Sequence, residues 1–211
     1  RVILHEKEIE RLNTQTTAEL LEKRAGINVQ KSQMGGGSPV TRGFESNRVL
    51  LVVDGVRLNN AIYRGGHLQN IISVDNASLE QVDVIFGPSS SEFGSDALGG
   101  VIHLQTKRPK FTENRSFSHT YTTRYASANK GLSRHYDMQY TGANYALYSS
   151  FSHSDFDDLR MGANRTHGYA DWGKVYHYIE DGEQVENEDP NIQKNTGYSQ
   201  ADFMQKIILK L

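Results

Sequence analysis

The residues best suited to binding chemistry form one short run, Tyr63-Arg64-Gly65-Gly66-His67. A neutral imidazole is a good ligand for iron, and a guanidinium nearby can pair with carboxylates on a ligand. An aromatic ring can pack on a flat ligand, and the two glycines let that ligand approach the backbone closely. On these residues alone, a loop histidine that only makes hydrogen bonds is the alternative interpretation.

No other stretch of the sequence carries a catalytic motif. Ser89-Ser90-Ser91 lacks the nucleophile-elbow pattern, and Gly35-Gly36-Gly37 lacks the lysine of a phosphate-binding loop. His5-Glu6 has no second histidine four residues on, so it is not a zinc-protease motif. We therefore expect no enzyme and no intrinsic cofactor. The remaining candidates for ligand contact are aromatic residues of one polar stretch, Tyr169, Trp172, Tyr176 and Tyr178.

The composition excludes several broad classes of protein. With 23 Lys and Arg against 25 Asp and Glu, the chain lacks the basic footprint of a nucleic-acid-binding protein. The absence of cysteine excludes a disulfide scaffold and thiolate metal sites. No apolar run approaches the roughly 20 residues of a membrane-spanning helix, whereas alternating membrane strands escape such a test. No signal peptide is present, so we expect the sequence to begin inside a domain.

Residues 1–110 have the pattern of a compact mixed α/β domain. Thr16 or Thr17 can cap a helix that ends at Gly26. The apolar run 49–53 has the length of a strand and no polar face, so we expect it to be buried on both sides. The other expected elements are a strand at 3–4, a helical turn at 6–11, a strand at 27–30, a flexible loop at 35–37 and a turn at 54–55.

Beyond this first domain the helix signals stop and alternating strands begin. Apolar and polar side chains alternate with a period of two, for example Phe203 and Ile207 against Asp202 and Lys206. Each such segment has about 9–11 residues, the length that a tilted membrane-spanning strand needs. The alternation places His135 on the polar side, which would face the lumen of a barrel. The expected strands lie near 116–126, 132–142, 145–153 and 200–211.

The connections between these strands differ in length. Residues 126–131 form a short loop and 142–144 a tight turn, whereas 154–199 form a long polar loop. Short turns at one rim and long loops at the other are typical of outer-membrane barrels. The acidic residues of the long loop lack the spacing of a calcium loop, which favours solvated charge on an extracellular loop. A soluble β-sandwich is the alternative, since its strands alternate too.

The two halves together resemble TonB-dependent outer-membrane transporters, especially those of the Bacteroidetes type. The resemblance implies an α+β plug domain over 1–110, followed in 111–211 by the first four antiparallel strands of a transmembrane β-barrel. The complete barrel of such transporters has about 22 strands, and because four cannot close, we expect a longer protein. The motifs that carry the resemblance are 38–44 (SPVTRGF), 49–60 (VLLVVDGVRLNN), 79–88 (LEQVDVIFGP), 93–102 (FGSDALGGVI) and, for the Bacteroidetes type, 60–70.

The resemblance also implies a function and partners. Such a protein lies in the outer-membrane lipid of a Gram-negative bacterium and imports heme or another iron complex, with energy from TonB. In heme receptors that this chain resembles, a histidine in a Gly-His-Leu setting ligates the heme iron, which implies that role for His67. Heme is then the transported ligand, with a host heme protein as a further partner. Tyr63, Arg64 and Trp172 would contact the cargo, and Gly65 and Gly66 would let it approach.

One residue departs from the family pattern, and several alternatives stay open. Phe86 precedes Gly87-Pro88, where the family commonly carries an arginine of a buried charge network, so the way this plug is held is open. Within the transporter class, a siderophore or cobalamin is the alternative cargo. Outside it, the alternatives are a barrel-anchored surface binding protein, which needs no plug, and a soluble carbohydrate-binding β protein, which needs no detergent.

Overall fold

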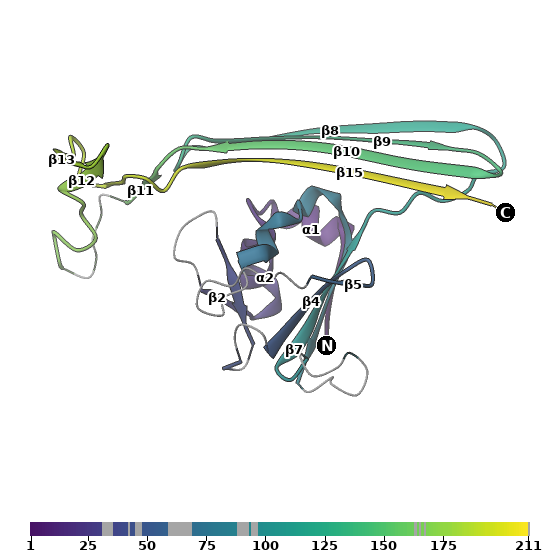
Figure 1. The fold of residues 1–211 in the computed structure, drawn as a ribbon, viewed down its shortest axis with the longest axis horizontal. Coiled ribbons are helices and arrows are strands. Elements are labelled where there is room, and N and C mark those ends of the chain that lie inside the picture. The colour runs from purple at the N-terminus through teal and green to yellow at the C-terminus, as the bar shows by residue number, and fades with distance from the viewer. Residues whose placement is uncertain are drawn as a thin grey trace.

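The computed structural model contains two main sheets. The first has five strands in the order β1-β6-β7-β4-β5, and the second has four in the order β15-β10-β9-β8. In Figure 1 the four long strands lie across the top of the view, with the helices and the five-stranded sheet below them. No helix within the described part of the chain is long and apolar enough to cross a membrane. The structure describes residues 1–30, 36–41, 43–44, 48–58, 69–87, 93, 97–162, 164, 166 and 168–210.

The N-terminal unit comprises the five-stranded sheet and the helices on it. Its pairs are antiparallel except for β4 and β7, which run parallel. The second helix begins where the Thr16 hydroxyl accepts a hydrogen bond from the Glu19 N–H at 3.2 Å, and it ends at Gly26 in the left-handed conformation. The elements are β1 (Val2–His5), α1 (Glu6–Leu12), α2 (Thr17–Ala25), β2 (Asn28–Gln30), β3 (Ser38–Val40), β4 (Val49–Val53), β5 (Val56–Arg57), the 3-10 helices η2 (Gln69–Ser73) and η3 (Asn76–Ser78), β6 (Leu79–Phe86) and β7 (Gly100–Thr106).

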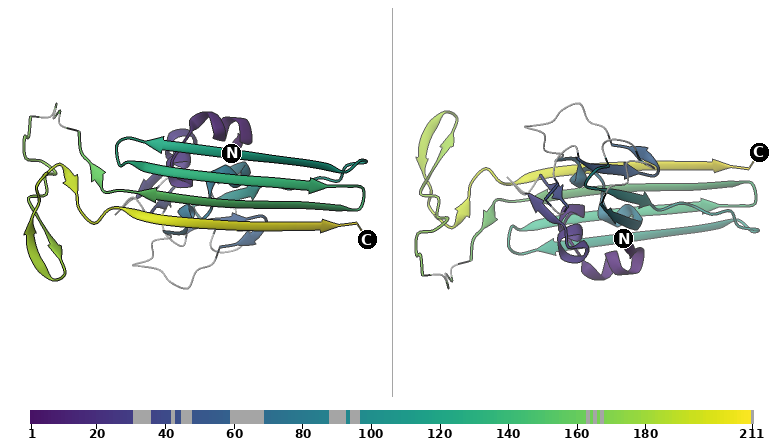
Figure 2. Two further views of the ribbon diagram at one scale, coloured as in Figure 1. Left: turned by 90° about the horizontal axis from the view of Figure 1, so that it is seen from above. Right: turned by 90° about the horizontal axis from the view of Figure 1, so that it is seen from below.

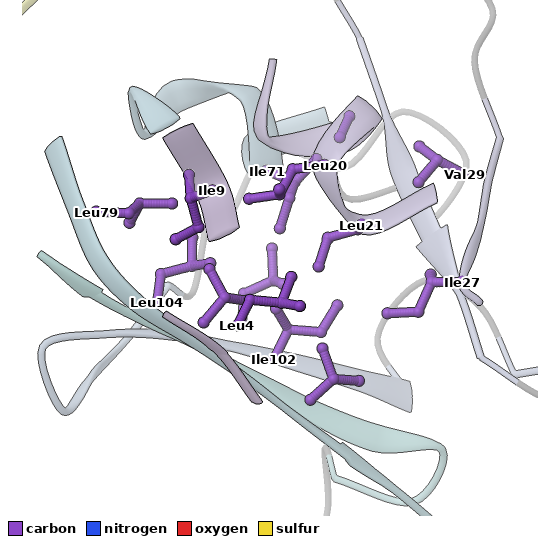
Figure 3. Packing of buried hydrophobic residues seen from close by; sticks show 14 of the residues in the cluster. Leu4, Ile9, Leu20, Leu21, Ile27, Val29, Ile71, Leu79, Ile102 and Leu104 are labelled. Atoms are coloured by element: carbon purple, nitrogen blue, oxygen red, sulfur yellow. The ribbon is translucent and has the colours of Figure 1, made fainter. Parts of the chain in front are cut away.

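The main apolar core lies between this sheet and the two α-helices. Ile9 of α1 and Leu20 and Leu21 of α2 pack toward Ile102 and Leu104 of β7, as Figure 3 shows. These side chains are removed from water almost completely, and apolar burial is the dominant stabilising term of folding. This core therefore joins the two helices to the sheet of the N-terminal unit.

A smaller core covers the opposite face of the sheet. Leu50 and Val52 of β4 point into it, whereas Val49 and Leu51 point into the main core. The expected strand at 49–53 is thus buried on both sides, and the glycine-rich segment supplies its cover through Ala97. Phe86 packs against the main core, which is the role of an apolar side chain and not of a charged one.

Gly100 shows why this segment needs glycine. Its φ is +150°, and a Cβ placed there would lie 2.5 Å from the backbone oxygen of Ile85. We expect Gly100→Ala to destabilise the N-terminal unit by at least about 2 kcal/mol, because both the backbone conformation and the contact are unfavourable for alanine. Denaturant unfolding of the purified protein measures this. Gly162→Ala is the matched control, since nothing lies within 4 Å of the added carbon, and an equal loss there would contradict the explanation.

The second sheet, which we call the wall, is a simple meander of long antiparallel strands. Each strand pairs with its sequence neighbour over most of its length. Figure 2 shows the N-terminal unit seated on one face of this wall in both views. The strands are β8 (Ser116–Ala126), β9 (Gly131–Thr141), β10 (Tyr145–Phe156) and β15 (Tyr198–Leu209).

The two faces of the wall have the opposite orientation to those of a sheet in a soluble protein, which turns its apolar face toward the rest of the protein. Its polar face is turned toward the N-terminal unit, and buried polar residues such as His135, Asp137 and Ser152 lie there. Its opposite face carries aromatic and aliphatic side chains that are exposed. A strand that is apolar outward and polar inward is the pattern of an outer-membrane barrel. The exposed apolar side chains are Phe117, Tyr121, Tyr125, Tyr136, Met138, Tyr140, Phe151, Phe203, Ile207 and Leu209.

The connection between β10 and β15 has more structure than a plain loop. β10 continues to Phe156 and β15 begins at Tyr198, so both strands extend into the expected loop 154–199. Side chains tie the remainder together: Asp158 accepts hydrogen bonds from the N–H groups of Thr196 and Gly197. The short strands inside it are β11 (Leu159–Arg160), β12 (His177–Glu180), β13 (Glu183–Glu186) and β14 (Ile192–Gln193), which pair as β11–β14 and β12–β13.

Candidate functional site

The contact between the N-terminal unit and the wall is built from charged and hydroxyl side chains. At its centre His135 of β9 is 6% exposed. Its Nδ1 lies 2.7 Å from the Ser152 hydroxyl and 2.9 Å from the Asp75 carboxylate, and its Nε2 lies 3.2 Å from Asp137. Asp75 also accepts a hydrogen bond from the Ala77 N–H, so this one carboxylate both begins η3 and binds the wall.

Lys107 extends this cluster to the first helix. Its ammonium lies 3.1 Å from the carboxylates of both Asp137 on the wall and Glu6 at the start of α1. Burial by itself lowers the pKa of Lys107, but the two carboxylates outweigh this and raise the pKa above its usual value. Lys107 immediately follows β7 and therefore connects three parts of the molecule through one charge.

A second charged contact lies at β15. The Lys206 ammonium is 3.0 Å from the Asp54 carboxylate and donates to the Thr106 carbonyl at 3.0 Å. Asp54 also accepts hydrogen bonds from the Thr106 N–H at 2.9 Å and the Thr106 hydroxyl at 2.6 Å. The β4–β5 turn, the end of β7 and the wall therefore meet at this one carboxylate.

One carboxylate in each contact, Asp75 in the first and Asp54 in the second, is stabilised in its ionised form. Burial raises the pKa of Asp75, but hydrogen bonds from His135 and Ser152 outweigh this and leave the pKa below its usual value. Burial also raises the pKa of Asp54, and hydrogen bonds from Thr106 and Lys206 outweigh it in the same direction. A lowered carboxylate pKa stabilises the folded contact at neutral pH, and this contribution is lost only as pH falls through the lowered value.

Further contacts between the two parts are polar as well. The Ser78 and Ser150 hydroxyl oxygens lie 3.3 Å apart, and Gln200 donates to the Ile72 carbonyl at 3.0 Å. Among the described residues, no wall residue belongs to either apolar core. Hydrogen bonds and ion pairs can exchange with water at small net cost, whereas buried apolar surface cannot. Separation of this interface would therefore open neither apolar core, although it would expose Tyr148 of the wall, which is now completely buried.

The arrangement of Ser152, His135 and Asp137 contains the residue types of a hydrolytic triad. The Ser152 hydroxyl, however, donates its hydrogen to Asp75, so the imidazole is not positioned as the base that removes that proton. The cluster therefore serves to join the two parts and not to activate a nucleophile.

The sequence-predicted ligand residues lie mostly elsewhere. Tyr63, Arg64, Gly65, Gly66 and His67 fall outside the described residues. Trp172 is described, with 65% of its side chain exposed, and its backbone N–H donates to the Tyr169 carbonyl at 3.2 Å. The long connection thus presents aromatic side chains to solvent, at a distance in sequence from the cluster around His135.

Sequence reasoning identified only half of this interface. The period-two alternation assigned His135, Asp137 and Lys206 to the polar side of the wall. It gave no signal for Asp75 or Lys107, which follow η2 and β7 without any motif. An isolated charged residue next to an element is normally solvated, and only the fold brings these two under the wall.

An N-terminal unit seated against the polar face of an outward-apolar sheet defines a plugged outer-membrane barrel protein. Residues 1–101 match the family model described as TonB-dependent Receptor Plug Domain. The chain is 32% identical over 199 residues to "Vitamin B12 transporter BtuB" of Vibrio vulnificus (strain YJ016), which covers 87% of this chain and 30% of that protein. A second protein of that name, from strain CMCP6, is 40% identical over 115 residues, 53% of this chain and 18% of its own length.

Solved structures agree on the fold. The FrpB iron transporter from Neisseria meningitidis (F3-3 variant) superposes with a TM-score of 0.74 at 18% identity, over 97% of this chain and 28% of that one. The copper transporter OprC gives a TM-score of 0.67 at 20% identity, over 78% of this chain and 25% of that one. The chain therefore belongs to the TonB-dependent receptors of the Gram-negative outer membrane. We call its N-terminal unit the plug from here on.

These matches also bear on completeness and on catalysis. The chain spans 30% of the length of the first curated relative. The four wall strands are accordingly part of a barrel and do not close by themselves. The relatives are transporters and receptors, which agrees with the expectation that the protein is not an enzyme.

Proposed function

We propose that the receptor containing this chain actively imports a metal complex across the outer membrane, with energy from TonB. The observation that carries the proposal is the polar interface between plug and wall. A barrel that is filled by a plug blocks free diffusion, so import requires the plug to move relative to the wall. An interface of ion pairs such as Lys206–Asp54 can be broken and rehydrated, which an apolar core does not permit.

The division of labour follows from this proposal. Residues 1–110 act as the plug, and 111–211 begin a barrel embedded in outer-membrane lipid, whose closure needs later strands. TonB acts on a segment on the N-terminal side of the plug. The connection at 154–199 lies outside the cell, where Trp172 and its neighbouring tyrosines contact the cargo or a host heme protein that delivers it.

For the cargo we propose a metal macrocycle, either heme or a corrinoid. The name of the two relatives, 32% and 40% identical, supports the corrinoid, and the Gly-Gly-His sequence at 65–67 supports heme. Both ligands are flat rings around a transition metal, and an imidazole is a ligand suited to such a metal. Heme leads on the residues, since Arg64 and Tyr63 offer partners for a propionate and for the ring.

Titration of the purified full-length receptor tests the cargo. We expect hemin to produce a shifted Soret band and His67→Ala to abolish the shift and to weaken binding about tenfold, the value of one lost strong ligand interaction. His5→Ala is the matched control, because that histidine is exposed at the end of β1, outside both the run at 63–67 and the long connection. If cyanocobalamin binds and hemin does not, the heme assignment is wrong and the corrinoid assignment stands. If neither binds, the macrocycle proposal is wrong.

A further inference from the structure

A cavity of about 280 Å³ lies between the plug and the wall. The plug side is formed by α1 and the residues that follow it, including Asn13 and Gln15, together with η3. The wall side is formed by β8, β9 and β10, including Arg124 on the inward face of β8. Most of the residues that line the cavity carry polar or charged side chains, so polar groups of a ligand would find hydrogen-bond partners there.

The carboxylates around this cavity already have cationic or hydrogen-bonding partners. Glu6 and Asp137 share Lys107, and Asp75 is held by His135 and Ser152. Glu19 interacts electrostatically with Arg124, but its carboxylate already has two partners. It lies 2.8 Å from the Lys23 ammonium and accepts a hydrogen bond from the Gln15 N–H at 2.6 Å. Glu10 also lines the cavity, but its side chain is exposed to solvent.

By contrast, two of the hydrogen-bond donors at the cavity have unpaired N–H groups among the described residues. Arg124 donates through Nε to the Asn13 carbonyl at 3.2 Å, but its buried Nη1 has no hydrogen-bond partner among the described residues. Gln15 lies two residues after Asn13, and its buried Nε2 has no hydrogen-bond partner among the described residues either. Arg124 forms no salt bridge within the described part of the chain. Buried donors are normally satisfied, and an anionic oxygen is the acceptor that a guanidinium binds most strongly.

We propose that this cavity binds an oxyanion, a carboxylate or a phosphate group, through the Arg124 guanidinium and the Gln15 amide. A guanidinium presents several N–H donors in one plane, which matches the oxygens of either group. The source of the oxyanion rests on the proposed function: it is a group carried by the cargo as the cargo passes between plug and wall. The cavity then gives the imported complex a second contact, separate from the one at the outer surface.

Calorimetric titration of the full-length receptor with inorganic phosphate tests the site itself. We expect Arg124→Gln to weaken phosphate binding at least about tenfold, since it removes a charge-assisted hydrogen bond, and Arg124→Lys to retain part of it. Arg115→Gln is the matched control, because Arg115 is exposed just before β8 and does not line the cavity. If the Arg124→Gln receptor does not fold, Gln15→Leu replaces it in the titration. This substitution removes only the second donor, and it should also weaken phosphate binding. Absence of binding by the unmodified receptor, or equal affinity in Arg124→Gln, would overturn the proposal.

Uptake by cells distinguishes the two sources of the oxyanion. The probes are hemin with its dimethyl ester, and cyanocobalamin with cobinamide, since the second member of each pair lacks the carboxylates or the phosphodiester. If the cargo supplies the group, Arg124→Gln slows uptake of the first member about tenfold and leaves its surface binding and the second member unchanged. If uptake is unaffected while phosphate binding is lost, a free anion occupies the site. If the unmodified receptor imports none of the probes, the proposed macrocycle cargo is wrong, and the phosphate titration still decides the site.

Discussion

A receptor that carries Ser78→Cys and Ser150→Cys is expected to bind its cargo and to import none of it until a reductant is added. Ser78 belongs to the plug and Ser150 to β10, and their hydroxyl oxygens lie only 3.3 Å apart. The 211 residues contain no cysteine, so no native thiol of this segment competes for the new bond. A disulfide would fix the plug to the wall covalently, whereas the present contacts are exchangeable. Uptake of labelled cargo should fall to background, with the affinity for cargo unchanged.

A crosslink inside the wall provides the control for this experiment. Ser149 and Gln205 face each other directly across β10 and β15, and the Ser149 hydroxyl donates to the Gln205 side chain at 2.7 Å. Cysteines at those two positions would join strands that stay together in any case, so uptake should be retained. Normal uptake by the oxidised Ser78→Cys, Ser150→Cys receptor would show that import needs no separation at this contact, and would contradict the proposed movement.

Lys107→Met is expected to destabilise the contact between the plug and the wall by about 3 kcal/mol. The substitution keeps the length of the side chain and removes the charge that Asp137 and Glu6 share at 3.1 Å. Asp137 is 6% exposed, so its carboxylate would remain buried with His135 alone. Removing one partner of a buried pair is costly because the remaining charge is desolvated without compensation. Thermolysin cleavage of the plug in the folded receptor should accelerate about 100-fold, as the population of separated plug rises with the lost free energy.

Lys130→Met separates this effect from a general loss of positive charge. Lys130 also pairs with a carboxylate, Asp157, at 3.4 Å, but the two side chains are 76% and 65% exposed. Exposed pairs contribute little, so cleavage should change less than about twofold. Equal acceleration in both variants would mean that burial of the Lys107 pair is not what holds the plug.

Phe86 and Lys107 together explain how this plug is held without the family's usual arginine. The aromatic ring of Phe86 joins the main core, so the position contributes apolar packing within the plug. The charged contacts to the wall are made instead by Lys107, Asp54 and Asp75, which lie in turns and at element ends.

The ends of the four wall strands could be predicted from the sequence to within about three residues, because each segment shows the alternation of polar and apolar side chains by itself. The expected strands near 132–142 and 200–211 compare with Gly131–Thr141 and Tyr198–Leu209 in the structure. The long connection was less accessible to such reasoning. Its strands are two to four residues long, and they are held by contacts such as Asn187 with the carbonyls of Val175 and Ile192, which no periodicity encodes.

What the sequence alone determined is that each strand of the second half has two chemically different faces. It could not determine which face is inside, because alternation is the same whether the apolar side meets a protein core or lipid. Only the tertiary structure decided this, by seating the plug on the polar face and leaving the aromatic face bare. The same is true of the charges. His135 and Asp75 are 60 residues apart in sequence, and their interaction exists only because the fold removes both from water at one place.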